Sequence, residues 1–333
     1  MAAPAATRRS SMPFFPSSAV KVERPRAIGL THVLDRLHGL NLDEIRPLAP
    51  YMDIVKIGWG LPLLLPKEEL KKRVKFYHSL GVEVSTGGTL LEYAITRDRV
   101  APLLDETREI GFDLVEVSDG IIDLSSTQIR HLSDEAKRRN LGVLIEVGKK
   151  NPQNQLSLRE TLDRVRDARA LEPRKVILES RESGKGVGIY DGEGGIKWDW
   201  VRTILSDHPA NDLIFEAPLE TQQISLIREL GAETNLGNVA ISSVAPLASQ
   251  RMGLRGDTFG TIRSSKIVRG PPATKFLYFL LESYGGLDQS DLVRLSRLPR
   301  RTVQSALEEL RHQSLVFESI SMIDSRRREY RLT

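Results

Sequence analysis

The residues best suited to chemistry stand at the end of one short apolar run, Leu144–Lys150. Its aliphatic residues are interrupted by Glu146 and are followed by Gly148, Lys149 and Lys150. A hydrophobic core needs neither a carboxylate inside such a run nor two ammonium groups at its end, because buried charges are costly. The pattern is typical of a buried strand whose carboxyl end carries a functional group.

Four other apolar runs also carry charged residues near their ends, at 54–58, 114–120, 176–182 and 213–218. If the five runs are parallel strands, their carboxyl ends meet on one face, where active sites lie in barrel enzymes. The charged side chains brought together there would be Lys56, Glu116, Asp119, Glu146, Lys149, Glu179, Arg181 and Glu216. Each one alone could equally form a buried ion pair that supports the fold. Eight of them at one end favour a ligand or metal site, since unpaired buried charge is costly.

Strand-like and helical patterns alternate from residue 27 onward. We expect strands at 27–31, 52–57, 82–86, 112–117, 142–147, 174–179, 212–216 and 236–241. Between two of them, Leu70, Val74 and Tyr77 recur at helical spacing. Eight strand–helix repeats predict an α/β fold, a (β/α)8 TIM barrel. The alternative, an open doubly wound sheet, calls for a glycine-rich phosphate loop after the first strand, where the sequence has 29–36 without that fingerprint.

The composition excludes several classes of protein. With 333 residues, the chain is long enough for one large domain and a small one. No apolar run approaches 18 residues, which predicts no membrane span. The absence of cysteine excludes disulfides, thiolate metal sites and a cysteine nucleophile. Without the apolar core of a secretory signal, the sequence predicts a cytoplasmic protein, and we also expect a homo-oligomer.

Charge is distributed unevenly along the chain. Basic residues exceed acidic ones in 1–26 and 261–333, whereas 27–260 is net acidic. Basic ends on an acidic body argue against nucleic-acid binding by the whole protein and leave it open for one end. The N-terminal segment 1–25 is rich in Ala, Pro, Ser and Arg, a composition that predicts a disordered tail. A targeting peptide is the alternative. The predicted domains are the tail, a barrel at 26–262, a linker at 263–272 and a second domain at 273–333.

Three glycine-rich stretches are candidates for binding an anion. The first, 182–195, would follow the sixth strand and reads either as a lid using Lys185 or as a long flexible connection. The second is Gly87–Thr89, which includes Gly88. The third combines the last strand with the loop beyond it, where phosphate is often bound in this fold. Its candidate residues are Gly237, Asn238, Arg255 and Gly256.

The C-terminal domain has a different pattern. Helical stretches at 273–284, 291–297 and 300–313 are followed by a hairpin-like segment at 315–332, which predicts a winged helix-turn-helix. As a DNA reader, the 300–313 helix would offer Arg300, Arg301, Gln304 and Arg311, and the wing would offer Arg326, Arg327 and Arg328. Binding to DNA and docking to a protein partner or a second copy remain equal alternatives, since the net charge of this domain is low.

The barrel motifs, taken in order, resemble those of the phosphosulfolactate synthase family. The matching stretches are Lys56–Gly60, Gly87–Thr89, Glu116–Gly120, Glu146–Lys150, Arg181–Gly186, Phe215–Pro218, Asn235–Asn238 and Leu254–Thr258. The resemblance covers about 26–260, and a heat-stress-associated branch of plants and fungi shares the barrel. It implies a TIM-barrel lyase of coenzyme M biosynthesis. This enzyme adds sulfite to phosphoenolpyruvate with Mg²⁺, giving (2R)-phospho-3-sulfolactate.

The implied reaction dictates the groups that the site needs. Attack on C3 of an enolpyruvyl group places charge on C2 and the adjacent carboxylate, so a cation and a proton donor are required. Because Mg²⁺ takes oxygen ligands, Glu116, Glu146 and Glu179 are candidate metal ligands, and Lys149 is the candidate proton donor. Further assignments are Lys56 and Arg181 to the substrate carboxylate or sulfite, and the glycine-rich residues with Arg255 to phosphate. Asp35, Lys185 and Glu216 complete the expected substrate-binding set.

Two other functions are compatible with the same motifs. One is a related barrel that uses another nucleophile on an enolpyruvyl phosphate, or binds it without turnover. The other is a phosphoenolpyruvate-sensing regulator that binds DNA through the C-terminal domain.

Overall fold

The computed structural model describes residues 24–37, 42–259, 268–284, 286–313, 315–320 and 328–332. The chain divides into two compact units, residues 1–262 and 263–333. Each unit has its own hydrophobic core.

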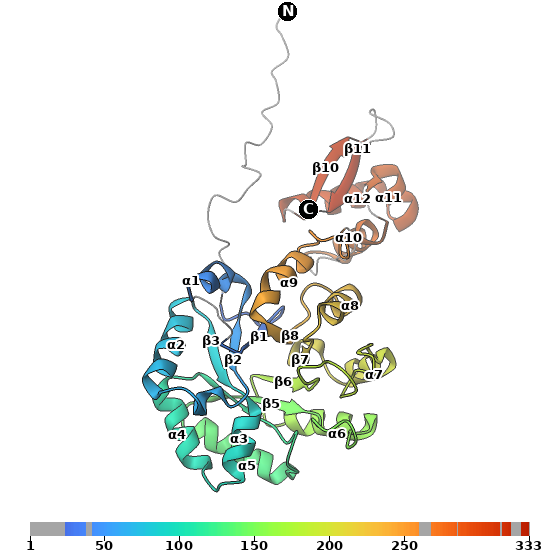
Figure 1. Ribbon diagram of the computed structural model, residues 1–333. Coiled ribbons are helices and arrows are strands. Elements are labelled where there is room, and N and C mark those ends of the chain that lie inside the picture. Colours follow the sequence, from blue (N-terminus) through green and yellow to red (C-terminus); the bar gives the residue numbers. More distant parts are fainter. Residues whose placement is uncertain are drawn as a thin grey trace, which may run out of the picture. The chain divides into compact units, whose positions relative to one another are not determined.

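The first unit is a closed barrel of eight parallel strands, each paired with its neighbour in sequence and the last paired with the first (Figure 1). The strands are β1 (Thr31–Asp35), β2 (Ile54–Ile57), β3 (Glu83–Thr86), β4 (Leu114–Val117), β5 (Gly142–Val147), β6 (Lys175–Leu178), β7 (Leu213–Glu216) and β8 (Leu236–Ala240). The predicted (β/α)8 barrel is confirmed, and its closure excludes the open doubly wound sheet.

Helices surround the strands (Figure 1). They are α1 (Leu42–Ile45), α2 (Lys67–Ser79), α3 (Gly88–Ile95), α4 (Val100–Ile110), α5 (Ser126–Arg138), α6 (Leu158–Arg169), α7 (Trp198–Asp207), α8 (Glu220–Leu230) and α9 (Val244–Arg251). Short 3-10 helices lie at Arg46–Tyr51, Leu61–Leu63, Ala210–Asp212 and Ile241–Ser243. Capping boxes fix the starts of two helices, with Ser125 before α5 and Ser157 before α6.

Both faces of each barrel strand are buried, but they are buried against different surroundings. The outward residues, such as Val115, Ile145 and Phe215, pack with the helices in the main core. The inward residues begin with an aliphatic layer that forms a separate cluster of Ile54, Leu114, Leu144, Ile177 and Ile214. Because strand side chains alternate between the two faces, the residues two positions further on point into the barrel as well. Those residues are Lys56, Glu116, Glu146, Glu179 and Glu216, so a charged layer lies on top of a dry one.

The sequence misplaced one strand. The first was predicted at 27–31 and lies at Thr31–Asp35. The apolar residues before Thr31 suggested a strand, but Gly29 has a left-handed φ of 67° and breaks that run. The true strand contains His32 and Asp35, two polar residues that are fully buried.

The second unit combines α10 (Pro272–Tyr284), α11 (Gln289–Ser296) and α12 (Arg300–His312) with three short strands. These are β9 (Leu287–Asp288), β10 (Val316–Ile320) and β11 (Arg328–Leu332), in the antiparallel order β10-β11-β9. The winged helix stays a prediction, and its wing residues Arg326 and Arg327 lie outside the described residues. None of the described helices is long and apolar enough to cross a membrane.

Candidate active site

The charged layer opens into a small cavity at the carboxyl ends of the barrel strands, which we call the mouth. Its charged residues come from β2, β4, β5, β7 and the loops that follow β5 and β6. The mouth is lined by Leu34, Lys56, Gly58, Trp59, Gly87, Gly88, Thr89, Glu116, Glu146, Lys150, Glu179, Glu182, Glu216 and Asn238. The structure therefore brings five of the eight predicted strand-tip charges together.

Lys56 is held between two carboxylates inside the mouth. Its Nζ lies 3.0 Å from Oε1 of Glu216 and 3.4 Å from Oε2 of Glu116, and its side chain is 9% exposed. Burial opposes its charge, yet the two carboxylates raise the pKa of Lys56 above its ordinary value. Lys56 is thus a fixed ammonium group.

Glu116 contacts protein groups through both of its carboxylate oxygens, although the buried Oε1 lacks a hydrogen bond of good geometry. His32 Nε2 lies 3.2 Å from its Oε1, and the backbone N–H of Gly88 donates to its Oε2 at 3.0 Å. Although burial opposes ionisation, Lys56 and His32 lower the pKa of Glu116. These contacts connect Glu116 to β1, β2 and α3.

Lys150 joins two further carboxylates. Its Nζ lies 2.7 Å from Oε1 of Glu146 and 3.0 Å from Oε2 of Glu179. Burial opposes the charge of Lys150, but Glu146 and Glu179 raise its pKa well above the ordinary value. The two carboxylates differ, because burial and the neighbouring Glu146 raise the pKa of Glu179 well above its usual range, whereas Lys150 lowers the pKa of Glu146 against the effect of burial.

We expect Glu179→Gln to remove a pH dependence of stability from the metal-free protein. A carboxyl whose folded pKa is raised contributes stability below about pH 4.5 that is lost as pH rises through the folded pKa. Glutamine resembles the protonated form at every pH. The variant should therefore gain stability relative to the parent between pH 5 and pH 8, because only the parent must ionise this buried side chain as the pH rises. Urea unfolding at both pH values measures this, and the same difference at each would contradict it.

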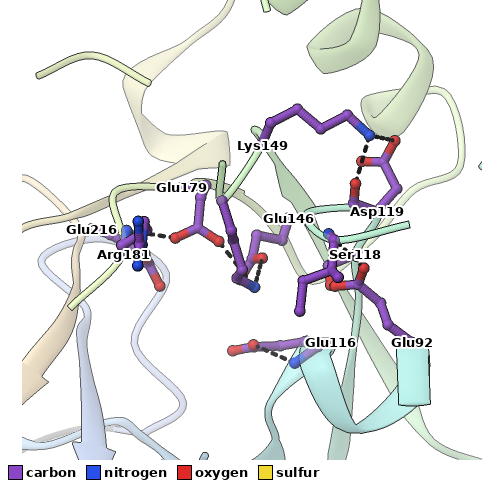
Figure 2. A network of polar contacts seen from close by, with 12 residues as sticks. Glu92, Glu116, Ser118, Asp119, Glu146, Lys149, Glu179, Arg181 and Glu216 are labelled. Carbon is purple, nitrogen blue, oxygen red and sulfur yellow. Dashed lines mark hydrogen bonds and ion pairs between the residues drawn. The ribbon is translucent and has the colours of Figure 1, made fainter. Parts of the chain in front are cut away.

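Lys149 and Asp119, both expected in the mouth, lie beside it and bind each other. Lys149 Nζ lies 3.0 Å from Oδ2 of Asp119 and 2.8 Å from Oδ1 of Asp123, and Arg164 also pairs with Asp119. Figure 2 shows the Lys149 side chain reaching to Asp119 rather than toward Glu146 and Glu179.

The physical reason is Gly148, whose φ of +145° ends the alternation of β5. A Cβ there would lie 2.6 Å from Cβ of Glu179, so only glycine fits. Beyond this turn Lys149 leaves the mouth and Lys150 lines it.

Asp35 also lies outside the mouth. It accepts hydrogen bonds from Arg73 Nε at 2.5 Å and from the Tyr77 hydroxyl at 2.7 Å, both on α2. Its place in the strand explains this, because Asp35 shares the outward face with Val33, while His32 and Leu34 face inward. The expected substrate-binding residue is an ion-paired support between β1 and α2.

The loop after β6 is folded onto the barrel. Gln222 of α8 donates to the carbonyls of Gly184 and Gly194, and the Tyr190 hydroxyl donates to the carbonyl of Glu216 at 2.5 Å. Lys185 is exposed on this loop and does not line the mouth. The structure shows neither a long free connection nor a lid with Lys185 over the mouth.

Arg181 contacts residues of the mouth through its backbone N–H and carbonyl groups. Its N–H donates to Oε1 of Glu179 at 2.6 Å, and its carbonyl accepts from Nδ2 of Asn238 at 3.2 Å. The guanidinium belongs to a half-buried residue next to the lining residue Glu182.

The glycine-rich candidates separate into two groups. Gly87, Gly88 and Asn238 line the mouth, with Gly87 at the N-cap of α3. Gly237 lies within the barrel, where an added Cβ would come within 3.3 Å of His32 Nδ1. Arg255 and Gly256 do not line the mouth, and Arg255 pairs with Glu220 at 2.9 Å. They follow α9 rather than β8, which is why their loop is separated from the strand tip.

Sequence reasoning missed three features of the mouth. Lys149 was chosen as the proton donor in place of its neighbour Lys150. His32 was not recognised, because the first strand was predicted to end one residue before it. The third is Trp59, whose Nε1 donates to Oε1 of Glu182 at 2.9 Å across the rim. The guanidinium of Arg36 lies 5.0 Å from the centre of the Trp59 ring. The left-handed φ of Trp59, 55°, is a signal visible only in the structure.

No group of three His, Asp or Glu side chains among the described residues is assembled as a metal site. The predicted trio therefore separates into Glu116, which is bound by protein groups, and the pair Glu146 and Glu179. In that pair, Oε2 of Glu179 is buried and lacks a hydrogen bond of good geometry. Two hard oxygen ligands still suit Mg²⁺, which is usually bound by one or two carboxylates together with waters and substrate phosphate.

Comparison with known proteins places these features in a family. Residues 20–257 match the family model of (2R)-phospho-3-sulfolactate synthase, ComA. The phosphosulfolactate synthase of Methanocaldococcus jannaschii is 37% identical over 240 residues, 70% of this chain and 95% of that protein. That of Bacillus subtilis is 32% identical over 249 residues, 72% of this chain and 96% of that protein. Protein HEAT-STRESS-ASSOCIATED 32 of Arabidopsis thaliana is 25% identical over 129 residues, 35% of this chain and 44% of that protein.

Proposed function

The chain belongs to the (2R)-phospho-3-sulfolactate synthase family, and from this membership we propose that it adds sulfite to C3 of phosphoenolpyruvate with the help of Mg²⁺. Its family makes it a lyase-type enzyme. The nucleophile, the acceptor and the metal are the parts of this proposal that need an experiment.

The observation that carries the proposal is the composition of the charged layer. Four buried acidic side chains, Glu116, Glu146, Glu179 and Glu216, face only two ammonium groups, Lys56 and Lys150, in the mouth, and burial together with this crowding raises the pKa of Glu179. A site with excess negative charge repels a phosphorylated carboxylate. A divalent cation reverses that balance, so anionic substrates and Mg²⁺ are expected to bind together.

Glu146 and Glu179 are the residues that would hold the cation. They meet at the Lys150 ammonium, which shows that a positive charge is already stabilised between them. When bound there, Mg²⁺ would supply charge stabilisation for an enediolate and a contact for the substrate oxygens. The partners of Glu116 and Glu216 are instead the fixed ammonium of Lys56 and backbone amides.

The proposed reaction is balanced by one proton. The sulfur lone pair of sulfite forms the C–S bond at C3, and the electrons of the C2–C3 double bond move to C2 and into the adjacent carboxylate. A proton delivered to C2 then completes (2R)-phospho-3-sulfolactate. The Lys150 ammonium, which lines the mouth, is the group that we assign to this transfer.

Other parts of the mouth are suited to hold the anions. Gly87 caps α3, whose positive N-terminal end favours a phosphate group, with the Gly88 N–H already donated to Glu116. Lys56 is fixed by its two carboxylates and can attract the substrate carboxylate without moving. Arg181 stays a candidate for sulfite at the rim. Arg255 is no longer a candidate for binding phosphate, because it pairs with Glu220 away from the mouth.

The test is product formation from ¹³C-labelled phosphoenolpyruvate and sulfite, followed by NMR. We expect a sulfonated, phosphorylated three-carbon product with Mg²⁺, a fall to background after metal removal by EDTA, and recovery on adding Mg²⁺ back. Sulfate in place of sulfite is the matched control, because it has no sulfur lone pair. Turnover that persists in fully metal-depleted protein would contradict the metal assignment. Phosphoenolpyruvate binding without a sulfonated product would contradict the choice of nucleophile.

A further inference from the structure

The C-terminal unit carries a second surface with no part in the reaction proposed for the mouth. Its α11 and α12 are joined by only three residues, Arg297–Pro299, and Arg297 makes the turn with a left-handed φ of 56°. The side chain of Asp288 caps α11 by accepting from the N–H of Asp291 at 2.7 Å. This tight turn fixes α12 against α11.

One face of α12 is committed to the core of its own unit. Val303, Ala306, Leu307 and Leu310 are buried, and they pack in one cluster with residues of α10 and α11. The opposite face is exposed at Arg300, Arg301, Gln304, Ser305, Glu308, Arg311 and His312. This face is polar throughout, so it is not a hidden apolar interface.

The charges of the exposed face are segregated along the helix. Its first turn and the preceding turn hold Arg297, Arg300 and Arg301, all exposed. Within the described part of the chain, none of the three has an ion pair or side-chain hydrogen bond. Further along, Arg311 lies near Glu318, and Glu308 is exposed, so the C-terminal half is close to neutral.

Unpaired arginines on a helix that follows a tight turn fit the phosphates and base edges of duplex DNA. The major groove is about 12 Å wide and admits one α-helix, and recognition helices contact bases with their N-terminal residues. The order helix, strand, helix, helix, hairpin matches the winged helix-turn-helix arrangement, with β10 and β11 forming the hairpin. We propose that the C-terminal unit binds duplex DNA, with the N-terminal half of α12 in the major groove.

Within this proposal the residues have distinct tasks. Arg297 lies in the turn between the helices and contacts a phosphate. Arg300, Arg301 and Gln304 project from the exposed face of α12 and reach the groove. Arg294 is excluded from the contact set because it pairs with Asp291 at 2.8 Å.

The experiment uses the full-length protein and a fluorescent random-sequence duplex of about two helical turns. Binding is measured by anisotropy at several salt concentrations. We expect binding at low salt that weakens steeply as salt rises. For Arg300→Ala/Arg301→Ala, the slope of log K against log salt should shrink by about 2, and the affinity should fall roughly tenfold or more.

The matched control is Arg269→Ala/Lys275→Ala, which removes the same charge from exposed positions of the same unit outside the helix-turn-helix and the hairpin. It should bind like the parent. A second probe is double-stranded RNA of equal length, whose deep, narrow major groove excludes a helix, so binding should be weaker than to DNA. Circular dichroism confirms that each variant is folded.

Three results would overturn the proposal. The first is no duplex binding by folded protein at low salt, which would favour docking to a protein partner. The second is an equal loss in both double variants, which would mean diffuse attraction to any polyanion. The third is equal affinity for DNA and RNA duplexes.

Discussion

Replacement of Lys150 by Met is expected to lower kcat for phosphosulfolactate formation by about 10²–10⁴-fold, the usual contribution of a positioned proton donor. Lys150 is one of the two ammonium groups that line the mouth, and its Nζ lies within 3.0 Å of carboxylate oxygens of both Glu146 and Glu179. Without it the carbanion at C2 has no positioned donor. Steady-state kinetics with phosphoenolpyruvate, sulfite and Mg²⁺ measure the loss.

Lys149→Met is the matched control, because it changes the adjacent residue in the same way. Lys149 is held by Asp119 and Asp123 beside the mouth, so its loss should reduce stability and leave the chemical step close to the parent rate. Rescue of Lys150→Ala by a small alkylammonium ion would separate proton donation from a purely structural role. The reverse result, with Lys149→Met inactive and Lys150→Met active, would restore Lys149 as the donor.

Replacement of Lys56 by Met is expected to lower the free energy of unfolding by about 3–5 kcal/mol, the range for breaking a buried ion pair from one side. The variant would leave Glu116 and Glu216 without the ammonium that lies 3.4 Å and 3.0 Å from them. Activity should fall as well, because the layer would carry still more negative charge. Urea unfolding followed by circular dichroism measures the change in stability.

A second substitution tests the reason for that loss. Lys56→Met/Glu216→Gln also removes one of the two carboxylates left without a counter-charge and should recover part of the stability. A double-mutant cycle measures the coupling energy between Lys56 and Glu216. Lys72→Met is the control, because Lys72 pairs with Glu69 on the exposed side of α2 and its loss should have little effect. An unfolding free energy for Lys56→Met equal to that of Lys72→Met would show that the buried pairs do not support the barrel.

The sequence was a good guide wherever strand alternation decides which way a side chain faces. Glu116, Glu146, Glu179 and Glu216 each follow a buried aliphatic residue by two positions, so their common inward direction could be predicted once parallel strands were assumed. The barrel followed from the same rhythm of strands and helices.

Prediction failed where the chain leaves regular structure. Beyond β5, the direction of Lys149 and Lys150 depends on the backbone at Gly148, and no pattern of residue types reveals a φ of +145°. His32 was overlooked and Asp35 was wrongly placed in the substrate site, because the first strand was predicted four residues too early. The residues that alternate between the two faces of the strand were therefore the wrong ones. Arg255 follows a glycine-rich motif that looks like a strand-tip loop, but α9 intervenes.

The aliphatic layer beneath the mouth also determines by which route molecules can enter and leave the site. Ile54, Leu114, Leu144, Ile177 and Ile214 pack together beneath the mouth, so among the described residues the barrel axis offers the site no second exit. The Trp59–Glu182 hydrogen bond crosses the rim of the mouth. In the proposed reaction, product would leave through the same opening by which the next substrate enters. For the proposed reaction, we therefore expect accumulated product to inhibit competitively with respect to phosphoenolpyruvate.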